Sequence, residues 1–279
     1  MDYKTILVHL DAGARSTERL ELALALADRY DAHLVGLFAL SAMRTPSYVR
    51  ADTVALLVAA QERQRAEAAA AAEAKFRAAA ARYGSVKAEW RVSHGDALGA
   101  VQLSARYSDL VIIGQRDRDA ERETGIAPEF VDELVVSCGR PVLVVPYAGH
   151  YPDAGKRVLV AWNASAEASR AMSDALPLLA RAERVNVVVF HAGSPGDHGE
   201  EPGADAALYL ARHGVKAAVS RYGSPGLDIG SQILSRAADL TVDLIVMGAY
   251  GHSRIRELVL GGATRSLLES MTAPVLMSR

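Results

Sequence analysis

The sequence contains a single cysteine, Cys138, among its 279 residues. One thiol excludes an intramolecular disulfide and suits a reducing compartment. The chain has no apolar run of about 18 residues and no signal-peptide pattern after its first methionine, so we expect a cytoplasmic protein without membrane partners. The net charge of -2 gives no electrostatic reason to expect a nucleic acid as a partner.

The sequence also lacks the motifs of common enzymes and cofactor sites. Neither Gly-x-Gly-x-x-Gly nor a Gly-Lys-Ser/Thr loop occurs, which excludes the dinucleotide fingerprint and the P-loop. The eight histidines show no metal-ligand spacing, and there is no Gly-x-Ser-x-Gly nucleophile elbow. We therefore expect no catalytic residues and no metal site built by the protein alone.

The two halves of the chain repeat each other. Residues 4–11, KTILVHLD, align with residues 156–163, KRVLVAWN, at an offset of 152 positions. Residues 109–114, DLVIIG, align with residues 243–248, DLIVMG, at an offset of 134. The smaller offset places an insertion of about 18 residues in the first half. The chain is predicted to be a tandem duplication, with domains at residues 1–149 and 150–279.

Apolar runs alternate with helical patterns in both halves, which indicates parallel β-α-β units. Strands are expected at residues 5–10, 33–39, 86–92, 110–113, 142–145, 158–161, 186–191, 216–220, 244–247 and 275–277. Helices are expected at residues 17–30, 52–83, 97–107, 167–182, 204–213, 228–239 and 263–271, with one more ending at Gly139. These patterns predict an α/β fold of two tandem domains, each a five-stranded parallel-type sheet with helices on both faces.

The helix expected at residues 52–83 is rich in alanine and carries scattered charges. Alanine is the strongest helix former, and the charges give the helix a solvated face. We predict a surface helix that packs on its own sheet. A docking surface for another protein is the alternative.

A buried strand at residues 244–247, LIVM, leads into a glycine-rich turn. The glycines and the first residues of the helical pattern that follows are Gly248, Gly251, Gly261, Gly262, Ala263 and Thr264. Such a turn presents free main-chain N–H groups and the positive end of a helix dipole, which together form a phosphate site. The alternative is that these glycines only permit tight turns.

The spacing Gly248-x2-Gly251-x9-Gly261 resembles the nucleotide-binding signature of the universal stress protein family, Gly-x2-Gly-x9-Gly-Ser/Thr. The resemblance implies Rossmann-like domains of the adenine nucleotide α-hydrolase-like kind. It also implies ATP or another adenine nucleotide as ligand, with or without Mg²⁺. Gly262 stands where the family has Ser or Thr, so a hydroxyl donor is lost while the main-chain N–H remains.

Two further residues of the second half are expected near the nucleotide. Asn163 ends the first strand of that half, where its amide can hold a ribose hydroxyl or an adenine edge. Equally, it can cap the turn into the next helix, beside Ser165 as N-cap. Ala192 matches the family position whose main chain approaches adenine.

The first half has lost the corresponding glycine loop. Gly114 is followed by Gln115 and Arg116, and Asp117 stands where the second glycine would be. We therefore predict one nucleotide site per chain, although Asp11 remains a candidate for holding a ribose.

The resemblance implies a stress-response role in which bound nucleotide acts as a conformational signal. The two halves are expected to pair through their last strands, as in a dimer of single-domain members, and a homodimer of whole chains is left open. Two other functions remain as alternatives: a nucleotide-free scaffold for an unidentified protein partner, and a slow ATP hydrolase.

Overall fold

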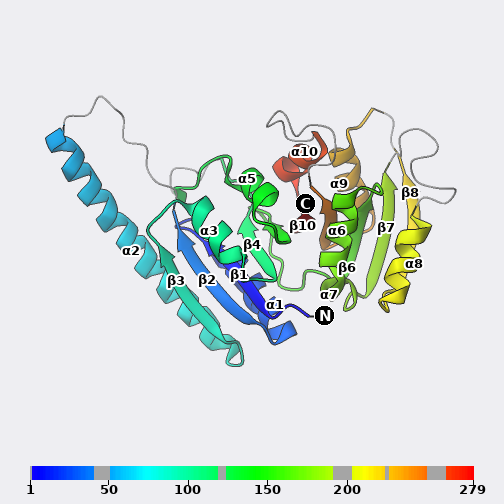
Figure 1. Ribbon diagram of the computed structural model, residues 1–279, viewed down its shortest axis with the longest axis horizontal. Coiled ribbons are helices and arrows are strands. Elements are labelled where there is room, and N and C mark those ends of the chain that lie inside the picture. Colours follow the sequence, from blue (N-terminus) through cyan, green and yellow to red (C-terminus); the bar gives the residue numbers. More distant parts are fainter. Residues whose placement is uncertain (1, 41–50, 119–123, 191–202, 224–225, 250–261) are drawn as a thin grey trace.

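The computed structural model describes all residues except 1, 41–50, 119–123, 191–202, 224–225 and 250–261, and for residues 51–57 only the backbone. Ten strands form one sheet in the order β3-β2-β1-β4-β5-β10-β9-β6-β7-β8 (Figure 1). The first half supplies β1 Thr5–Leu10, β2 His33–Ala39, β3 Ala88–Ser93, β4 Leu110–Gly114 and β5 Val142–Val145. The second supplies β6 Arg157–Trp162, β7 Arg184–Phe190, β8 Ala217–Tyr222, β9 Leu244–Gly248 and β10 Val275–Ser278.

Helices cover both faces of the sheet, as the alternating patterns predict. One face carries α1 Ser16–Tyr30, α2 Ala51–Tyr83, α6 Ala166–Asp174, α7 Leu176–Leu179 and α8 Ala204–Arg212. The other carries α3 Ala97–Ala105, α5 Phe130–Ser137, α9 Ile229–Asp239 and α10 Gly262–Ser270. Successive strand residues enter opposite cores, so Ile6 and Val8 pack toward α1 while Leu7 packs toward α3 and α5.

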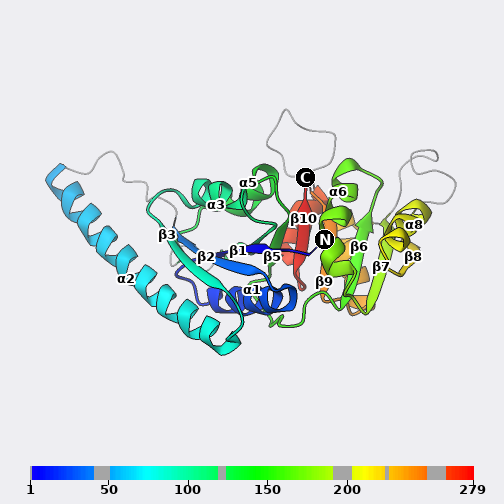
Figure 2. The same cartoon turned by 60° about the horizontal axis from the view of Figure 1, so that its bottom comes forward.

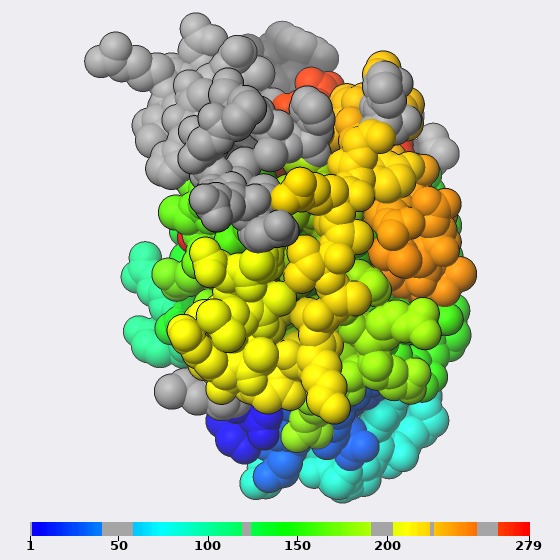
Figure 3. Space-filling model, turned by 90° about the vertical axis from the view of Figure 1, so that its right-hand side faces the viewer, coloured from blue at the N-terminus to red at the C-terminus, as the bar shows by residue number. Residues whose placement is uncertain are grey.

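The two halves join through their last strands. β5 pairs antiparallel with β10, placing Val144 opposite Val275 and Val142 opposite Met277. These residues are at most 1% exposed, and the cores on both faces continue across the junction. The predicted pairing is confirmed. The outer edges of the sheet are β3 and β8, and Figure 3 looks onto the β8 end, where α8 and β8 are yellow.

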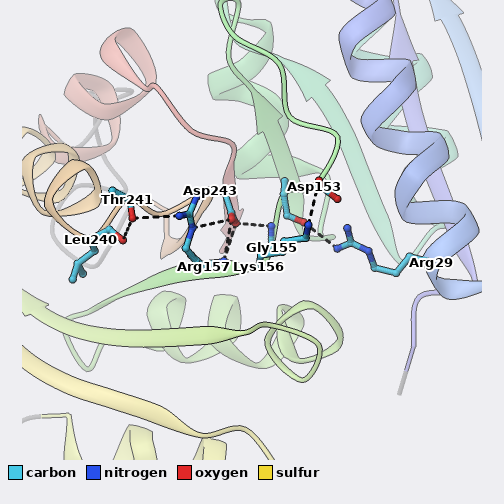
Figure 4. Close-up of polar contacts among 9 residues, drawn as sticks. Arg29, Asp153, Gly155, Lys156, Arg157, Leu240, Thr241 and Asp243 are labelled. Carbon is cyan, nitrogen blue, oxygen red and sulfur yellow. Dashed lines mark hydrogen bonds and ion pairs between the residues drawn. The ribbon is translucent and has the colours of Figure 1, made fainter.

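The segment between the halves is fixed at the amino ends of the strands (Figure 4). The Asp243 carboxylate accepts hydrogen bonds from the N–H groups of Gly155, at 2.8 Å, and Arg157, at 3.0 Å. Arg29 of the first half donates to the Ala154 carbonyl oxygen at 3.0 Å. The start of β6 is thereby held by both halves of the chain.

The long helix α2 packs on its own sheet through its second part, which confirms the predicted surface helix. Phe76 and Ala79 are buried, whereas Val58 is 39% exposed. The first turns project beyond β3 at the left of Figures 1 and 2. Within the described chain no helix, α2 included, is both long and apolar enough to cross a bilayer.

Two helix ends follow from single residues. The helix expected at residues 167–182 is instead two helices, because Pro177 lacks an N–H and its ring collides with the preceding turn. α5 ends at Ser137, two residues before Gly139, whose φ of 66° is a left-handed conformation that suits glycine. The predicted stop at Gly139 is confirmed.

Candidate functional site

The carboxyl ends of β6 and β9 lie side by side in the second half. The two strands pair in parallel, with Ala161 opposite Met247. The chain leaves β6 toward β7 and leaves β9 toward β10, so the direction of winding reverses between them. Ligands of doubly wound sheets bind outside such a switch point. Asn163, which directly follows β6, and Gly248, which ends β9, therefore share the expected edge.

Gly248 permits a close approach between β9 and the start of α6. A Cβ on Gly248 would lie 2.4 Å from the Ala168 nitrogen and 2.5 Å from the Glu167 carbonyl carbon. Neither atom can move without displacing the first turn of α6. Gly248 is thus required by packing, which supports the view that this glycine serves the fold whether or not it also approaches a ligand.

Gly262 is the first residue of α10 and, unlike Gly248, is not crowded by any described atom. A Cβ placed on it meets no described atom within 4 Å. Ala263 and Thr264 follow in the first turn, and Thr264 is 4% exposed. The first N–H groups of a helix have no partner within the helix, so this end of α10 offers main-chain donors. Gly251, Gly261 and Ala192 lie outside the described residues.

Asn163 makes the capping contacts that the sequence suggested as an alternative to ligand binding. Its Oδ1 accepts from the Ser165 N–H at 3.2 Å, and Ser165 Oγ accepts from the Ala168 N–H at 3.1 Å. Ser165 is therefore the N-cap of α6, as predicted. Asn163 itself is exposed, and its role toward a ribose or base stays a prediction.

Sequence reasoning overlooked Glu167, which lies one turn away. Its Oε2 is buried and has no hydrogen-bond partner among the described residues. Glu167 occupies the first turn of α6 at the carboxyl edge, where a negative charge is favoured by the helix dipole. An acidic residue in a first helical turn is common, so only the three-dimensional contact with Gly248 singles it out.

In the first half, Asp11 is already engaged by the protein. Its Oδ1 accepts from the Gly13 N–H at 2.8 Å, and its Oδ2 pairs with Arg19 NH2 at 2.5 Å. Both Asp11 and Arg19 are buried, at 5% and 6% exposure. Arg19 lies over Gly114, where an added Cβ would be 1.9 Å from the Nη1 atom of the arginine. The described residues contain no group of three or more His, Cys, Asp or Glu side chains placed to hold a metal ion.

The comparisons with known proteins agree with this architecture. A family model described as the universal stress protein family matches residues 2–146 and 226–279. The chain is 30% identical over 179 residues to the universal stress protein Slr1230 of Synechocystis sp., a match that covers 61% of this chain and 58% of that protein, less than two thirds of its length.

Two solved structures share the fold over the whole chain. A universal stress protein from Archaeoglobus fulgidus DSM 4304 superposes with a TM-score of 0.69 at 16% identity, covering 99% of this chain and 98% of the other. A functionally unknown protein from Pseudomonas aeruginosa PAO1 gives a TM-score of 0.57 at 16% identity, covering 99% and 92%. With the family model matching more than half of its residues, this chain belongs to the universal stress protein family.

Proposed function

We propose that this protein binds ATP or another adenine nucleotide in its second half and acts in stress response as a nucleotide-dependent regulator. In this proposal residues 1–149 and 150–279 are its two domains, and only the second holds nucleotide. The observation that carries the proposal is the start of α10 at Gly262, where no described atom lies within 4 Å of an added Cβ. A cytoplasmic location belongs to the proposal and is supported by the free, buried thiol of Cys138.

The described residues fit a polyphosphate at the start of α10. The main-chain N–H groups of Gly262, Ala263 and Thr264 would hold the phosphates, because donors and helix dipole both favour an anion there. In the family signature Gly251 and Gly261 complete this loop, Ala192 contacts adenine through its main chain and Asn163 lies near the ribose. Glu167, whose buried Oε2 has no hydrogen-bond partner among the described residues, would be available to a Mg²⁺ ion that accompanies the phosphates.

A matched pair of substitutions at Gly262 tests this assignment without disturbing the fold. Gly262→Asp places a carboxylate at the start of α10, which suits the helix dipole but repels phosphate. Gly262→Ser restores the hydroxyl that the family signature has. In calorimetric titration with ATP, we expect the aspartate variant to bind at least tenfold more weakly, about 1.4 kcal/mol. The serine variant should bind about two- to tenfold more tightly, the worth of one hydrogen bond.

The controls separate binding from stability. Thermal unfolding without nucleotide should show both variants at least as stable as the parent, because no described atom crowds the site. Equal ATP affinity in all three proteins, or heat of binding from none, would contradict the proposal.

A second candidate, the nucleotide-free scaffold, is favoured by one feature: the part of α2 that projects beyond β3 (Figure 2). A projecting helix has surface available to another protein. Purified protein that releases no adenine-absorbing material on denaturation, and gives no heat with ATP, would support this candidate over the first.

A further inference from the structure

The first half contains a cavity of about 290 Å³ that the proposed nucleotide site does not use. It lies at the carboxyl ends of β1 and β4, and its lining comes from the start of α1, the start of α5 and the residues after β5. Its volume is at the lower limit of ordinary ligand pockets, about 300 Å³. The cavity therefore suits a small molecule.

Two arginines on α1 supply positive charge to this cavity. Arg15 is the N-cap of α1 and Arg19 follows four residues later, so both side chains lie on one face of the helix. The Nε atoms of both arginines are buried and have no hydrogen-bond partner among the described residues. Arg19 is 94% buried, since its exposed fraction is 6%. A buried guanidinium N–H without an acceptor is costly, and an oxyanion in the cavity would supply one.

The two arginines differ in how far they are neutralised. Arg19 forms a salt bridge with Asp11 at 2.5 Å. Among the described residues, Arg15 donates to the carbonyl oxygen of Gly149, at 2.6 Å, which is a neutral acceptor. The dipole at the start of α1 adds to the positive potential at the same place.

The net charge of the residues that line the cavity indicates which ligand charge would neutralise it. Among the lining residues that the structure describes, Arg15, Arg19 and Arg116 are cationic and Asp11 and Asp117 are anionic, a formal excess of one positive charge, with Arg116 and Asp117 each making a further interaction. His9 adds none at neutral pH, because burial lowers its pKa to about 4. A monoanion would neutralise the cavity, whereas a polyphosphate would leave several negative charges uncompensated.

The remaining wall is apolar. Ile126, Phe130, Val131 and Val145 line the cavity, and the ring of His9 packs against Phe130 with centroids 4.9 Å apart. Phe130 is 4% exposed and begins α5, whose first residues line the cavity together with those at the start of α1. One side of the cavity thus offers cations and the other an apolar surface that includes an aromatic ring.

We propose that this cavity binds a small organic monocarboxylate, with its carboxylate between Arg15 and Arg19 and its apolar part against Ile126 and Phe130. The guanidinium fork matches a carboxylate in geometry and charge. This site is separate from the proposed nucleotide site and does not depend on it.

Calorimetric titration of the full chain with benzoate tests the proposal, with acetate and inorganic phosphate as comparison probes. We expect benzoate to bind once per chain and at least tenfold more tightly than acetate or phosphate, because only benzoate fills the apolar side. Arg15→Gln should weaken benzoate binding at least tenfold, and Arg15→Lys should retain part of it. Arg140→Gln is the matched control: Arg140 also donates to a backbone carbonyl, that of Arg106, but lies outside the cavity.

Each outcome decides the proposal. Benzoate binding that is unchanged in a folded Arg15→Gln variant would overturn it, as would equal binding of acetate, phosphate and benzoate. No heat with benzoate at millimolar concentration would also overturn it. Titration with ATP in the presence of saturating benzoate distinguishes the two sites. ATP binding should be unchanged, so a negative result for one proposed site leaves the other proposal intact.

Discussion

Asp109 and Asp243 each accept hydrogen bonds from two main-chain N–H groups beside the first strand of their half, and one of the two donors, Thr5 or Arg157, is equivalent in the repeat. Asp109 Oδ2 accepts from the N–H groups of Lys4, at 2.8 Å, and Thr5, at 2.9 Å, at the start of β1. Asp243 Oδ1 accepts from Gly155 and Arg157 at the start of β6 (Figure 4). Each aspartate immediately precedes a central strand, β4 or β9, and fixes the strand beside it. The sequence repeat aligns these two residues, and the structure gives them one shared role.

Replacing either aspartate should destabilise the whole chain. Asp243→Ala leaves two main-chain N–H groups without their acceptor, which costs about 1–3 kcal/mol of the free energy of unfolding. Urea unfolding followed by circular dichroism measures the loss. Asp239→Ala is the control, since Asp239 is 53% exposed in its side chain and lies 3.8 Å from Arg236. Equal effects of the two substitutions would show that the carboxylate of Asp243 does not hold β6.

Gly248 and Gly262 should respond oppositely to the same small change. Gly248→Ala forces a methyl group into the first turn of α6, at 2.4 Å from the Ala168 nitrogen, and should cost about 1–3 kcal/mol. Gly262→Ala meets no described atom within 4 Å and should leave the melting temperature unchanged or slightly raised. Differential scanning calorimetry of both variants checks this, and a harmless alanine at Gly248 would refute the packing role.

His9 should make the protein less stable as the pH falls below about 6.5. Burial lowers its pKa from 6.5 to about 4, with smaller opposing and reinforcing effects from Asp11 and Arg19. Between these values the unfolded chain binds a proton that the folded chain does not. Stability from this residue is therefore complete above pH 6.5 and is lost progressively toward pH 4, by about 3 kcal/mol.

The variant His9→Gln isolates this contribution to the pH dependence. Glutamine keeps a donor for the Ala39 carbonyl oxygen, which now lies 2.9 Å from His9 Nε2, and has no titratable group. Unfolding free energies at pH 7 and pH 5 should differ less in the variant than in the parent. Identical differences would mean that His9 does not titrate below its ordinary range.

Gln115 should contribute to the contact between the halves. Its Nε2 donates to the Leu268 carbonyl oxygen at 2.8 Å, near the end of α10, and its Oε1 accepts from the Tyr147 N–H at 3.0 Å. Gln115→Ala leaves both groups unpaired and should lower the free energy of unfolding by about 2 kcal/mol. Gln102→Ala, which removes an exposed contact to Ser137, is the control and should cost under about 0.5 kcal/mol. A Gln115 effect no larger than that of Gln102 would contradict this role.

Much of the fold follows from local patterns. The runs at residues 5–10, 33–39 and 142–145 are strands at the predicted bounds, because buried parallel strands need continuous apolar residues. The projection of α2 could not be predicted, since an alanine-rich helix lacks a strong apolar stripe that would fix its contacts. The Asp11–Arg19 salt bridge and the cavity beside it depend on how α1 meets β4, which no local pattern encodes.

The candidate site likewise combines features that the sequence predicts with features that it does not. The strand predicted at residues 244–247 extends to Gly248, and the helix predicted at residues 263–271 begins at Gly262, so each bound differs from the prediction by one residue. The capping contacts of Asn163 were one of two alternatives, and only coordinates show that its Oδ1 accepts from Ser165. The unpartnered oxygen of Glu167 gives no signal in the sequence, because burial of a single atom depends on neighbours distant along the chain.

Native mass spectrometry of the full chain with added ATP tests the central claim most directly. The account predicts a single nucleotide adduct per chain, present in the parent and in Gly262→Ser and strongly reduced in Gly262→Asp. No adduct, two adducts per chain, or one adduct that Gly262→Asp leaves undiminished would contradict it.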